Sequence, residues 1–403
     1  MEFRPIFLSL KHYKVFSLMI IVQVALTFTA VTYSSLGTYS LVREWNVPSG
    51  LRQENQIWAW PQFYDLNVNI EPVVEDDLQK LRALPGVRAV TTTNAFPFAN
   101  EQVSNIYRDS GENAQTFATN IFEMDQTAID ALGVELLEGR TFSANEVVRG
   151  ERSSLTSYPS VALISQQQAT AMFEGQSAVG QTIWLGQNSR PVQVIGVYSN
   201  FMNGESLNAQ GMSYHTVVIP LVAWTQRANS QYLIRTEPGA AEGLLESIRS
   251  VLYKTPGRYL YRVEVLTLAK KRMYDGRGSQ ALIMMLVSGV LIIITGLGMA
   301  GLVSFLVTQR VKQIGVRRAL GAKKIDIQRY FLLENSIVTW IGLAVGMVFI
   351  LIMTYQQLAE SGENFLRIHY MVIIALFLWA VNLVAIYIPA HRATRIEPAI
   401  VTR

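Results

Sequence analysis

Four long apolar stretches dominate the pattern of hydrophobic and polar positions along the chain. None of them contains Asp, Glu, Lys or Arg, and they run for 28, 31, 25 and 21 residues. A helix needs about 20 residues to cross the hydrocarbon core of a bilayer, so each stretch is long enough to do so. The pattern predicts four transmembrane helices, at 15–42, 279–309, 335–359 and 370–390.

The composition of the chain agrees with this interpretation. Of its 403 residues 50% are hydrophobic and 16% are charged, whereas soluble domains carry about 25% charged residues. A soluble globular protein is therefore excluded. The first apolar run is also too long for a cleaved signal peptide, and no small-residue cleavage site closes it. The chain has no cysteine, which excludes disulfides and thiolate metal sites.

The basic residues are unevenly distributed among the aqueous segments. Segments 1–14, 310–334 and 391–403 together hold 13 Lys and Arg residues but only four Asp and Glu residues. Because Lys and Arg accumulate on the cytoplasmic side of membrane proteins, we expect both termini and the 310–334 loop to be cytoplasmic. Segment 43–278 and the short loop 360–369 then lie outside. The net charge of +4 reflects this topology, and no nucleic-acid partner is expected.

The outer segment 43–278 is expected to be an α+β domain. Residues 64–94 and 231–268 each show a strand, a helix and a strand, with a Pro-Gly break after the helix. The first strand is placed in YDLNVNI, at 64–70. Two such halves, far apart in sequence, indicate a split ferredoxin-like subdomain with an inserted mixed α/β subdomain at about 100–230. The proline-free flanks of the first two spans predict helical stalks that extend beyond the lipid.

No catalytic residue, metal ligand or cofactor is predicted on this chain. The four histidines are scattered, and there is no HExxH or GxSxG motif and no Gly-Lys dipeptide for a Walker A loop. A GxGxxG match at 296–301 lies inside an apolar span, with no strand before it. Glu75, Asp76 and Asp77 are attributed to a helix N-terminus, where the helix dipole favours carboxylates.

Glycines within the second and third spans predict close packing between helices, within one subunit or across a dimer. Small residues allow helix backbones to approach each other in membranes. The alternative is that a membrane helix simply tolerates glycine at these positions. The candidate packing residues are Gly296, Gly298, Gly301, Gly342 and Gly346.

The most informative segment is QRVKQIGVRRALGAKKIDIQRYFLLEN, residues 309–335. Val311, Ile314, Ala319 and Leu320 are expected on one broad side of a short helix at the cytoplasmic interface. Gly321 then breaks that helix before the chain returns to the third span. The alternative is an ordinary positively charged loop, which requires the charges but not this order of residues.

This segment resembles the cytoplasmic loop of the FtsX-like, or MacB-like, permease family, in which IG-x-x-RALGA lies between the second and third of four spans. GVELLEGRTFSANE at 133–146, VALISQQQATAMFEG, VGQTIWL and VQVIGVYSN resemble the MacB-type periplasmic core, and PAHRATRIEPAI resembles the family's C-terminus. The resemblance covers essentially the whole chain. Two departures are the missing fused ATPase domain of MacB and an IVTR ending where Ala-Leu-Arg is more usual.

The resemblance implies a permease subunit of an ABC transporter in the bacterial inner membrane. A homodimer or heterodimer of permeases would sit on two ATPase subunits, which bind ATP and Mg. ATP-driven motion would be transmitted to the periplasmic domains for export of peptides, toxins or lipid-linked cargo. A periplasmic adaptor and an outer-membrane channel are possible further partners. The residues implied in ATPase coupling are Arg317, Arg318, Ala319, Leu320, Gly321 and Ala322.

Alternatives remain open at this point. Arg317 and Arg318 are also suited to anionic lipid headgroups in the membrane. At the level of function, the alternatives are a lipoprotein-releasing permease and an FtsX-like regulator of a periplasmic cell-wall hydrolase, although the outer domain of FtsX is much smaller. A membrane-anchored sensor without an ATPase leaves the RALGA segment unexplained.

Overall fold

The computed structural model of the chain describes residues 14–64, 68–98, 103–111, 114–186, 190–203, 212–224, 231–361 and 368–394. The chain divides into two compact units. One is a helical unit, Met1–Val42 with Arg277–Arg403, and the other is an α/β unit, Arg43–Gly276. Most of the predicted segments 1–14, 360–369 and 391–403 lies outside the described residues.

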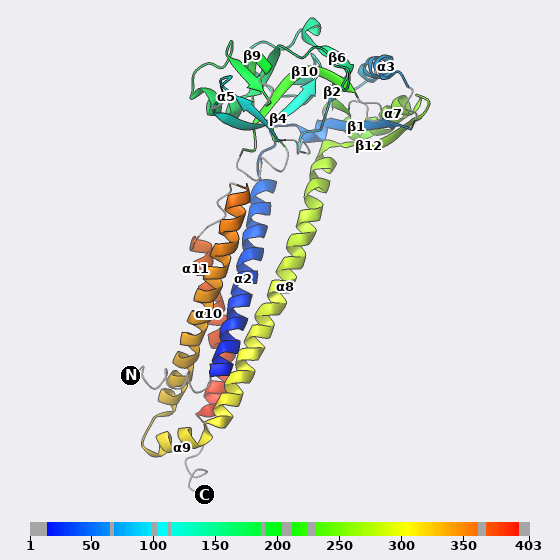
Figure 1. Cartoon of the computed structure of the whole chain (residues 1–403). Helices are drawn as coiled ribbons and strands as arrows, with labels where there is room; N and C mark the ends of the chain where they lie inside the picture. Colours follow the sequence, from blue (N-terminus) through cyan, green and yellow to red (C-terminus); the bar gives the residue numbers. More distant parts are fainter. Residues whose placement is uncertain are drawn as a thin grey trace. The chain divides into compact units, whose positions relative to one another are not determined.

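Five helices are described in the region of the predicted spans (Figure 1). Four are long and apolar enough to cross a membrane, with candidate spans Lys14–Val42, Leu266–Gln309, Lys324–Gln356 and Ile368–Arg392. The first two helices continue beyond the charge-free runs, as the proline-free flanks predict. The helices are α2 (Lys14–Trp45), α8 (Leu266–Gln309), α9 (Val311–Ala319), α10 (Lys324–Ser361) and α11 (Ile368–Ala393).

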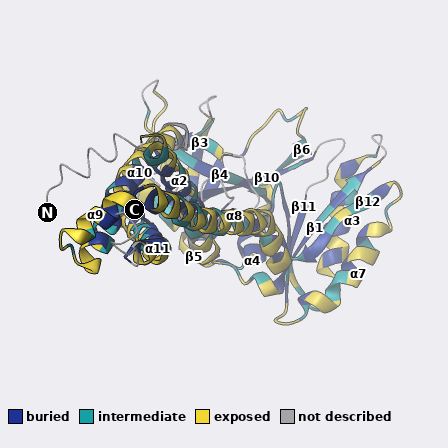
Figure 2. Cartoon of the chain, turned by 90° about the horizontal axis from the view of Figure 1, so that it is seen from below, coloured by how far each residue is buried: buried dark blue, intermediate teal, exposed yellow. Residues whose placement is uncertain are grey.

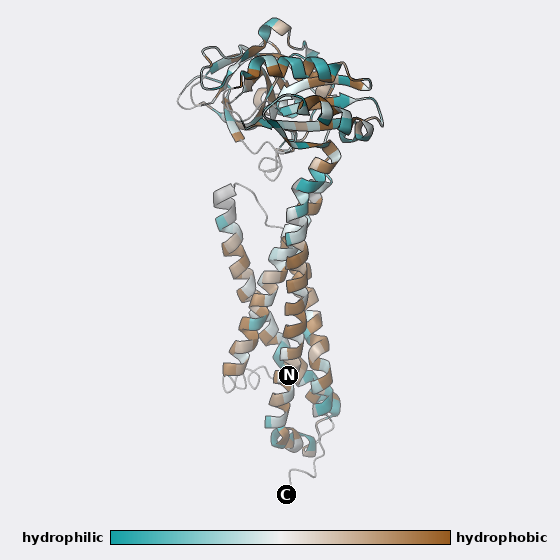
Figure 3. Ribbon diagram, turned by 90° about the vertical axis from the view of Figure 1, so that its right-hand side faces the viewer, coloured by the Kyte–Doolittle hydropathy of each residue, from teal (hydrophilic) through white to brown (hydrophobic). Residues whose placement is uncertain are grey.

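The helical unit packs around one side of α2. Ile20, Val24 and Phe28, spaced four residues apart along α2, are at most 2% exposed and belong to one apolar core with side chains of α8, α10 and α11. Apolar residues cover much of the length of these helices, as Figure 3 shows. In contrast, Leu286 and Leu297 of α8 are 63% and 69% exposed, and Figure 2 shows exposed positions all along α8. Large exposed apolar surfaces of this kind are typical of contact with lipid or a partner helix.

Four strands and two helices form one part of the α/β unit. The strand order is β12-β1-β11-β2, and every neighbouring pair is antiparallel. The helices α3 and α7 pack on one face, where Ile57, Leu81, Ile234 and Ile248 are completely buried. The elements are β1 (Gln56–Phe63), α3 (Ile70–Arg82), β2 (Val87–Thr93), β11 (Gln231–Thr236), α7 (Ala241–Tyr253) and β12 (Arg258–Val265).

The first strand of this part was placed wrongly from the sequence. The strand is β1, which ends at Phe63, whereas Ile70 already begins α3. Residues 65–67 lie outside the described residues. Pro61 interrupts the alternation of β1, and the pairing of β1 with β12 shifts register between Trp60 and Pro61. A bulge of this kind accommodates a residue that has no N–H group to donate.

Asp77 also has a different role from the one the sequence suggested. It lies in the middle of α3, away from the helix N-terminus, and is 1% exposed. Arg258 donates two hydrogen bonds to its carboxylate, at 2.9 and 2.7 Å, and the Tyr232 hydroxyl donates a third at 2.7 Å. Burial, together with the Asp77 carboxylate, raises the pKa of Tyr232 well above its ordinary value, which keeps the hydroxyl protonated. These three buried side chains join α3, β11 and β12.

The inserted residues form a ring of six strands with a separate core. β4 pairs with β3 and with β10, and the pairings β3–β8, β8–β9, β9–β7 and β7–β10 close the ring. Ile106, Ala162, Ile183 and Val217 are completely buried in its core. The strands are β3 (Val103–Tyr107), β4 (Thr116–Met124), β7 (Val161–Ser165), β8 (Thr182–Leu185), β9 (Arg190–Tyr198) and β10 (Thr216–Trp224). Short elements flank the ring: α4 (Ala128–Leu132), β5 (Leu136–Gly139), β6 (Val148–Glu151) and α5 (Gln166–Phe173).

The motif at 133–146 contains β5, which pairs with β9, and the turn that follows this strand. Gly139 has φ of +78°, and a Cβ atom there would lie 2.1 Å from the Ile195 carbonyl oxygen, so only glycine fits. Glu146 accepts hydrogen bonds from the Arg140 guanidinium at 2.8 and 2.6 Å and from the Ser143 N–H at 2.8 Å. The hydrogen bonds from Arg140, followed by those from Ser143, lower the pKa of Glu146 to about 2.

Glu146→Gln is expected to reduce stability in a pH-dependent way. The folded pKa lies below the ordinary value of 4.5, so the carboxylate stabilises the fold above about pH 4.5 and loses this effect as the pH falls toward 2. Because Arg140 is 55% exposed, the difference at neutral pH is expected to be only about 1 kcal/mol. Denaturant unfolding of the purified chain and variant between pH 7 and pH 2 measures it. A difference that stays constant over this range contradicts the assignment.

Candidate functional site

The RALGA residues form a tight helix end between α9 and α10. The Ala322 N–H donates to the Arg317 carbonyl at 3.0 Å, and the Gly321 N–H donates to the Arg318 carbonyl at 3.1 Å. These two bonds, with Gly321 at φ of +95°, define a Schellman motif, in which glycine is favoured because it adopts the left-handed conformation without strain. The next helix begins at once, because the Asp326 carboxylate accepts from the Lys323 N–H at 3.1 Å.

This turn presents Leu320 to solvent. Leu320 is 83% exposed, and Val316 and Ile325 beside it in sequence are 50% and 52% exposed. Ile314, in contrast, is 5% exposed and packs into the helical core. The sequence predicted that the apolar residues of this segment lie on one side of the helix. In the structure they do not share one side. Ile314 anchors the helix, whereas Leu320, the C-terminal cap residue of α9, is exposed.

The two arginines make contacts within the chain. The Arg317 guanidinium lies over the Tyr330 ring of α10, 4.8 Å from its centroid. Arg318 donates to the Thr394 carbonyl, just beyond α11, at 3.0 Å. Ala319 is the exposed last residue of α9, and Ala322 is half-buried. The structure thus brings all six predicted residues into one turn, and both arginines brace this turn against neighbouring segments.

A buried ion pair that the sequence reasoning missed lies at the start of α9. Arg310, between α8 and α9, donates from Nη1 and Nη2 to the Glu334 carboxylate of α10 at 2.8 and 3.2 Å. Both side chains are only 6% exposed. The signal in the sequence is a single acid, Glu334, directly beside an apolar run, where an unpaired charge is costly. The pair ties the junction of α8 and α9 to α10.

The candidate packing glycines differ in their surroundings. A Cβ atom at Gly342 or Gly346 of α10 would lie 2.9 Å from Val24 Cβ or 2.8 Å from the Ala25 carbonyl oxygen of α2. These two glycines therefore allow α10 to approach α2 within one chain. At Gly298 the nearest atom is in the Gln23 side chain at 2.8 Å, and at Gly296 it is the Ala385 Cβ at 3.8 Å. At Gly301 no atom of the described chain lies within 4 Å, so the structure shows no close approach there.

Gly346→Leu is expected to destabilise the helical unit by about 1–3 kcal/mol, because the larger side chain meets the backbone of α2. Gly301→Leu is the matched control, since it adds the same side chain in a helix where nothing lies within 4 Å. SDS titration of the two purified variants measures unfolding. Equal stability of the two variants contradicts a packing role for Gly346.

No group of three or more histidines, cysteines and carboxylates suited to a metal ion occurs among the described residues. The helical unit presents an exposed leucine on a hydrogen-bonded turn, two arginines that contact neighbouring segments, and a buried ion pair at the start of α9.

Comparisons with known proteins match two families along the chain. Residues 15–251 match the MacB-like periplasmic core domain, and residues 285–398 match the FtsX-like permease C-terminal domain. The chain is 24% identical over 277 residues to YknZ of Bacillus subtilis, named an uncharacterized ABC transporter permease. The aligned region covers 68% of this chain and 64% of YknZ. It is 25% identical over 275 residues to MacB of Escherichia coli, named a macrolide export ATP-binding/permease protein. That aligned region covers 66% of this chain and 41% of MacB. The chain thus matches less than two thirds of the length of either relative.

Solved structures with similarity to the chain include two domains. The periplasmic region of MacB from Actinobacillus actinomycetemcomitans matches with a TM-score of 0.34 and 15% identity, covering 58% of this chain and 98% of that one. The extracellular domain of the ABC-type transporter YknZ from Gram-positive bacteria matches with a TM-score of 0.30 and 15% identity, covering 51% of this chain and 100% of that one.

Proposed function

Because the chain belongs to the MacB-like and FtsX-like family of ABC transporter permeases, we propose that it couples ATP hydrolysis on a separate subunit to the export of cargo. Its sequence contains no Gly-Lys dipeptide for a phosphate-binding loop, so ATP and Mg are assigned to the partner ATPase. The name of the MacB relative, a macrolide export protein, supports export over the regulatory alternatives.

The observation that carries the proposal is the turn that presents Leu320. Its leucine is 83% exposed, yet the turn is held by backbone hydrogen bonds, by Arg318 and by the buried anchor Ile314. A rigid turn with an exposed apolar tip is suited to insertion into a pocket of another protein, because little conformational entropy is lost on binding. We assign this pocket to the ATPase.

The chain provides a direct mechanical route from this turn to the α/β unit. β12 ends at Val265 and α8 begins at Leu266, so no loop separates the strand from the helix. At its other end α8 is followed directly by Arg310, which pairs with Glu334, and then by α9. A displacement of α9 by the ATPase would therefore act on α8 and α10 together, and through α8 on β12.

In the same proposal, two such permeases form a homodimer or heterodimer, and an adaptor and an outer-membrane channel are further partners.

We also infer that the four-stranded part of the α/β unit is the split ferredoxin-like subdomain. Its strand order β12-β1-β11-β2, with α3 between β1 and β2 and α7 between β11 and β12, supports this assignment. The six-stranded ring lies in sequence between β2 and β11, as an insertion would.

We place the α/β unit outside the inner membrane and the α9 turn in the cytoplasm, on the basis of the basic residues around 310–334. The native chain has no cysteine, so single introduced thiols report topology without background. In intact spheroplasts, a membrane-impermeant maleimide is expected to label Ser157→Cys and to spare Lys323→Cys. Both residues are exposed, so both variants are expected to react after the membrane is permeabilised. Labelling of Lys323→Cys but not of Ser157→Cys in intact spheroplasts contradicts the proposed orientation.

The function is tested by reconstitution. The chain is co-expressed with a candidate ABC ATPase subunit from the same genome, purified and inserted into lipid nanodiscs. We expect the two proteins to copurify, and the rate of ATP hydrolysis to differ at least severalfold from that of the ATPase alone. An ATPase that neither copurifies with the chain nor changes its rate contradicts the proposed function.

A further inference from the structure

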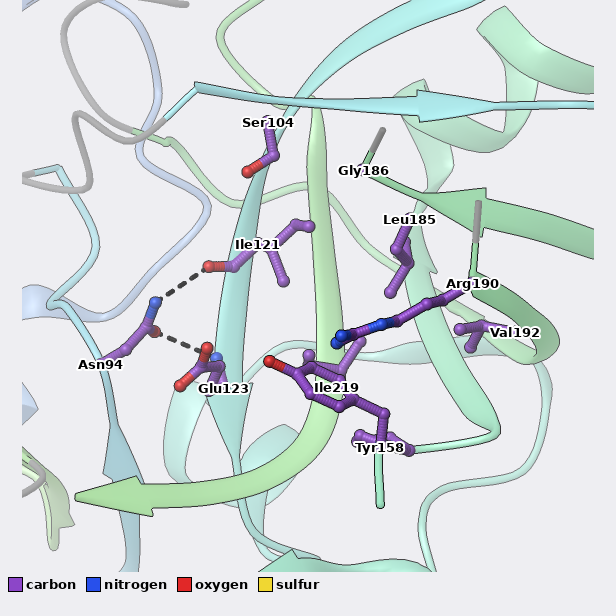
Figure 4. A pocket seen from close by; sticks show the side chains of 11 residues that line it. Asn94, Ser104, Ile121, Glu123, Tyr158, Leu185, Gly186, Arg190, Val192 and Ile219 are labelled. Atoms are coloured by element: carbon purple, nitrogen blue, oxygen red, sulfur yellow. Dashed lines mark hydrogen bonds between the residues drawn. The ribbon is translucent and has the colours of Figure 1, made fainter. Parts of the chain in front are cut away.

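A pocket of about 490 Å³ opens within the six-stranded ring of the α/β unit (Figure 4). Its lining includes apolar side chains from three strands of the ring, Ile121 of β4, Val192 of β9 and Ile219 of β10. Val192 and Ile219 are 2% and 3% exposed, so they form part of the ring's core as well as a wall of the pocket. These three side chains are the apolar part of a lining that also includes polar side chains, and they offer a contact surface for an apolar group of a small ligand.

On one wall of the pocket, an arginine side chain is stacked on an aromatic ring. Arg190 lies over the Tyr158 ring, with Cζ only 3.6 Å from its centroid. Within the described residues, no carboxylate lies within ion-pair distance of Arg190, and its side chain has no hydrogen-bond partner. Stacking on an aromatic ring restricts the guanidinium plane while its N–H donors stay available in the ring plane. These donors match the two oxygens of a carboxylate.

The opposite wall carries a carboxylate whose charge is already compensated. Glu123 forms a bidentate ion pair with Arg152, in which Nη1 donates to Oε1 at 3.0 Å. Its backbone N–H donates to the Asn94 side chain at 3.0 Å, and this amide in turn donates to the Ile121 carbonyl at 3.1 Å. Figure 4 shows Arg190 over Tyr158 on one side of the pocket and Glu123 beside Asn94 on the other. The two guanidiniums and one carboxylate leave a local charge of +1 for a ligand to neutralise.

We propose that this pocket binds a single carboxylate attached to a small apolar group, as at the C-terminus of a peptide that ends in leucine. Arg190 binds the carboxylate, Tyr158 holds Arg190 in place, and Ile121, Val192 and Ile219 contact the apolar group. One guanidinium fork matches the two oxygens of a carboxylate, and because Arg152 already compensates Glu123, the remaining charge of +1 balances a ligand with a single negative charge. The site lies entirely within the α/β unit, so it does not depend on the ATPase proposal.

The test uses the purified full chain in a non-ionic detergent, without any ATPase. The probe is a dansyl-Gly-Gly-Leu peptide with a free C-terminus, and its C-terminal amide is the matched probe. Fluorescence anisotropy is expected to show that the free acid binds at least tenfold more tightly than the amide. Arg190→Gln should weaken binding of the acid at least tenfold without changing that of the amide, and Tyr158→Leu should weaken it severalfold.

Arg249→Gln is the control variant, since it removes a half-exposed guanidinium from α7, outside the pocket lining, and should bind the acid like the unmodified chain. The thermal midpoint of Arg190→Gln should equal that of the unmodified chain, which separates loss of binding from loss of fold. Competition with 4-methylpentanoate distinguishes the source of the carboxylate. If 4-methylpentanoate displaces the peptide acid at a concentration equal to that of the peptide, the site is assigned to free branched carboxylates. If it displaces the peptide much more weakly, the site is assigned to peptide ends. Equal binding of acid and amide, or full binding by Arg190→Gln, overturns the proposal.

Discussion

Glu334→Ala is expected to lower the free energy of unfolding of the full chain by about 3–5 kcal/mol. The substitution removes the Glu334 carboxylate, which accepts two hydrogen bonds from the Arg310 guanidinium, itself only 6% exposed. Removal of one partner of a buried ion pair is among the most costly changes to a folded protein, because water does not replace the lost carboxylate. SDS titration of the purified variant in mixed micelles measures the loss.

The pair itself need not be more stable than an apolar contact of the same size. The double variant Arg310→Met with Glu334→Leu is therefore expected to regain most of the stability lost by Glu334→Ala. Arg329→Ala provides a control on α10, because Arg329 is exposed, and it should change the free energy of unfolding by at most about 0.5 kcal/mol. If the double variant is as unstable as the single one, the loss comes from packing around Glu334 and not from the broken ion pair.

The features that could be predicted from the sequence are those set by short stretches of chain. The four apolar helices follow from charge-free runs, and the break after α9 follows from Gly321, which allows the left-handed turn of the Schellman motif. The strands predicted at 88–94 and 231–236 correspond to β2 and β11, because each is a short β-prone run between turn signals. In each case the physical cause lies within a few residues of its effect.

The features that were missed depend on contacts between distant residues. Arg310 and Glu334 are 24 positions apart, and Asp77 and Arg258 are 181 positions apart, so neither pair leaves a local pattern. Without its partner in view, Asp77 was attributed to a helix N-terminus. The direction in which a residue faces is equally a matter of tertiary packing. Gly301 shares the small-residue pattern of Gly346, yet only Gly346 lies against a neighbouring helix.

The unequal packing of α9 is the reason why Leu320 and Ile314 cannot be distinguished by periodicity alone. Both are apolar and both belong to one short segment, but Ile314 is 5% exposed and Leu320 is 83% exposed. A polar replacement at Ile314 would disrupt the apolar core, whereas one at the exposed Leu320 should leave the fold unchanged. Leu320 is therefore the position at which coupling can be tested separately from folding.

Leu320→Asp is expected to abolish the effect of the chain on the partner ATPase while expression, membrane insertion and unfolding stay unchanged. Full enclosure of a leucine contributes about 1.5–3 kcal/mol, so its loss weakens binding by about 10- to 150-fold, and a buried aspartate adds a further penalty. Copurification and ATP hydrolysis in nanodiscs measure the effect. Leu137→Asp is the matched control, since Leu137 is an exposed leucine, 42% accessible, in the α/β unit, and should leave hydrolysis unaltered. A Leu320→Asp chain that copurifies with a fully stimulated ATPase would show that the α9 turn is not the coupling element.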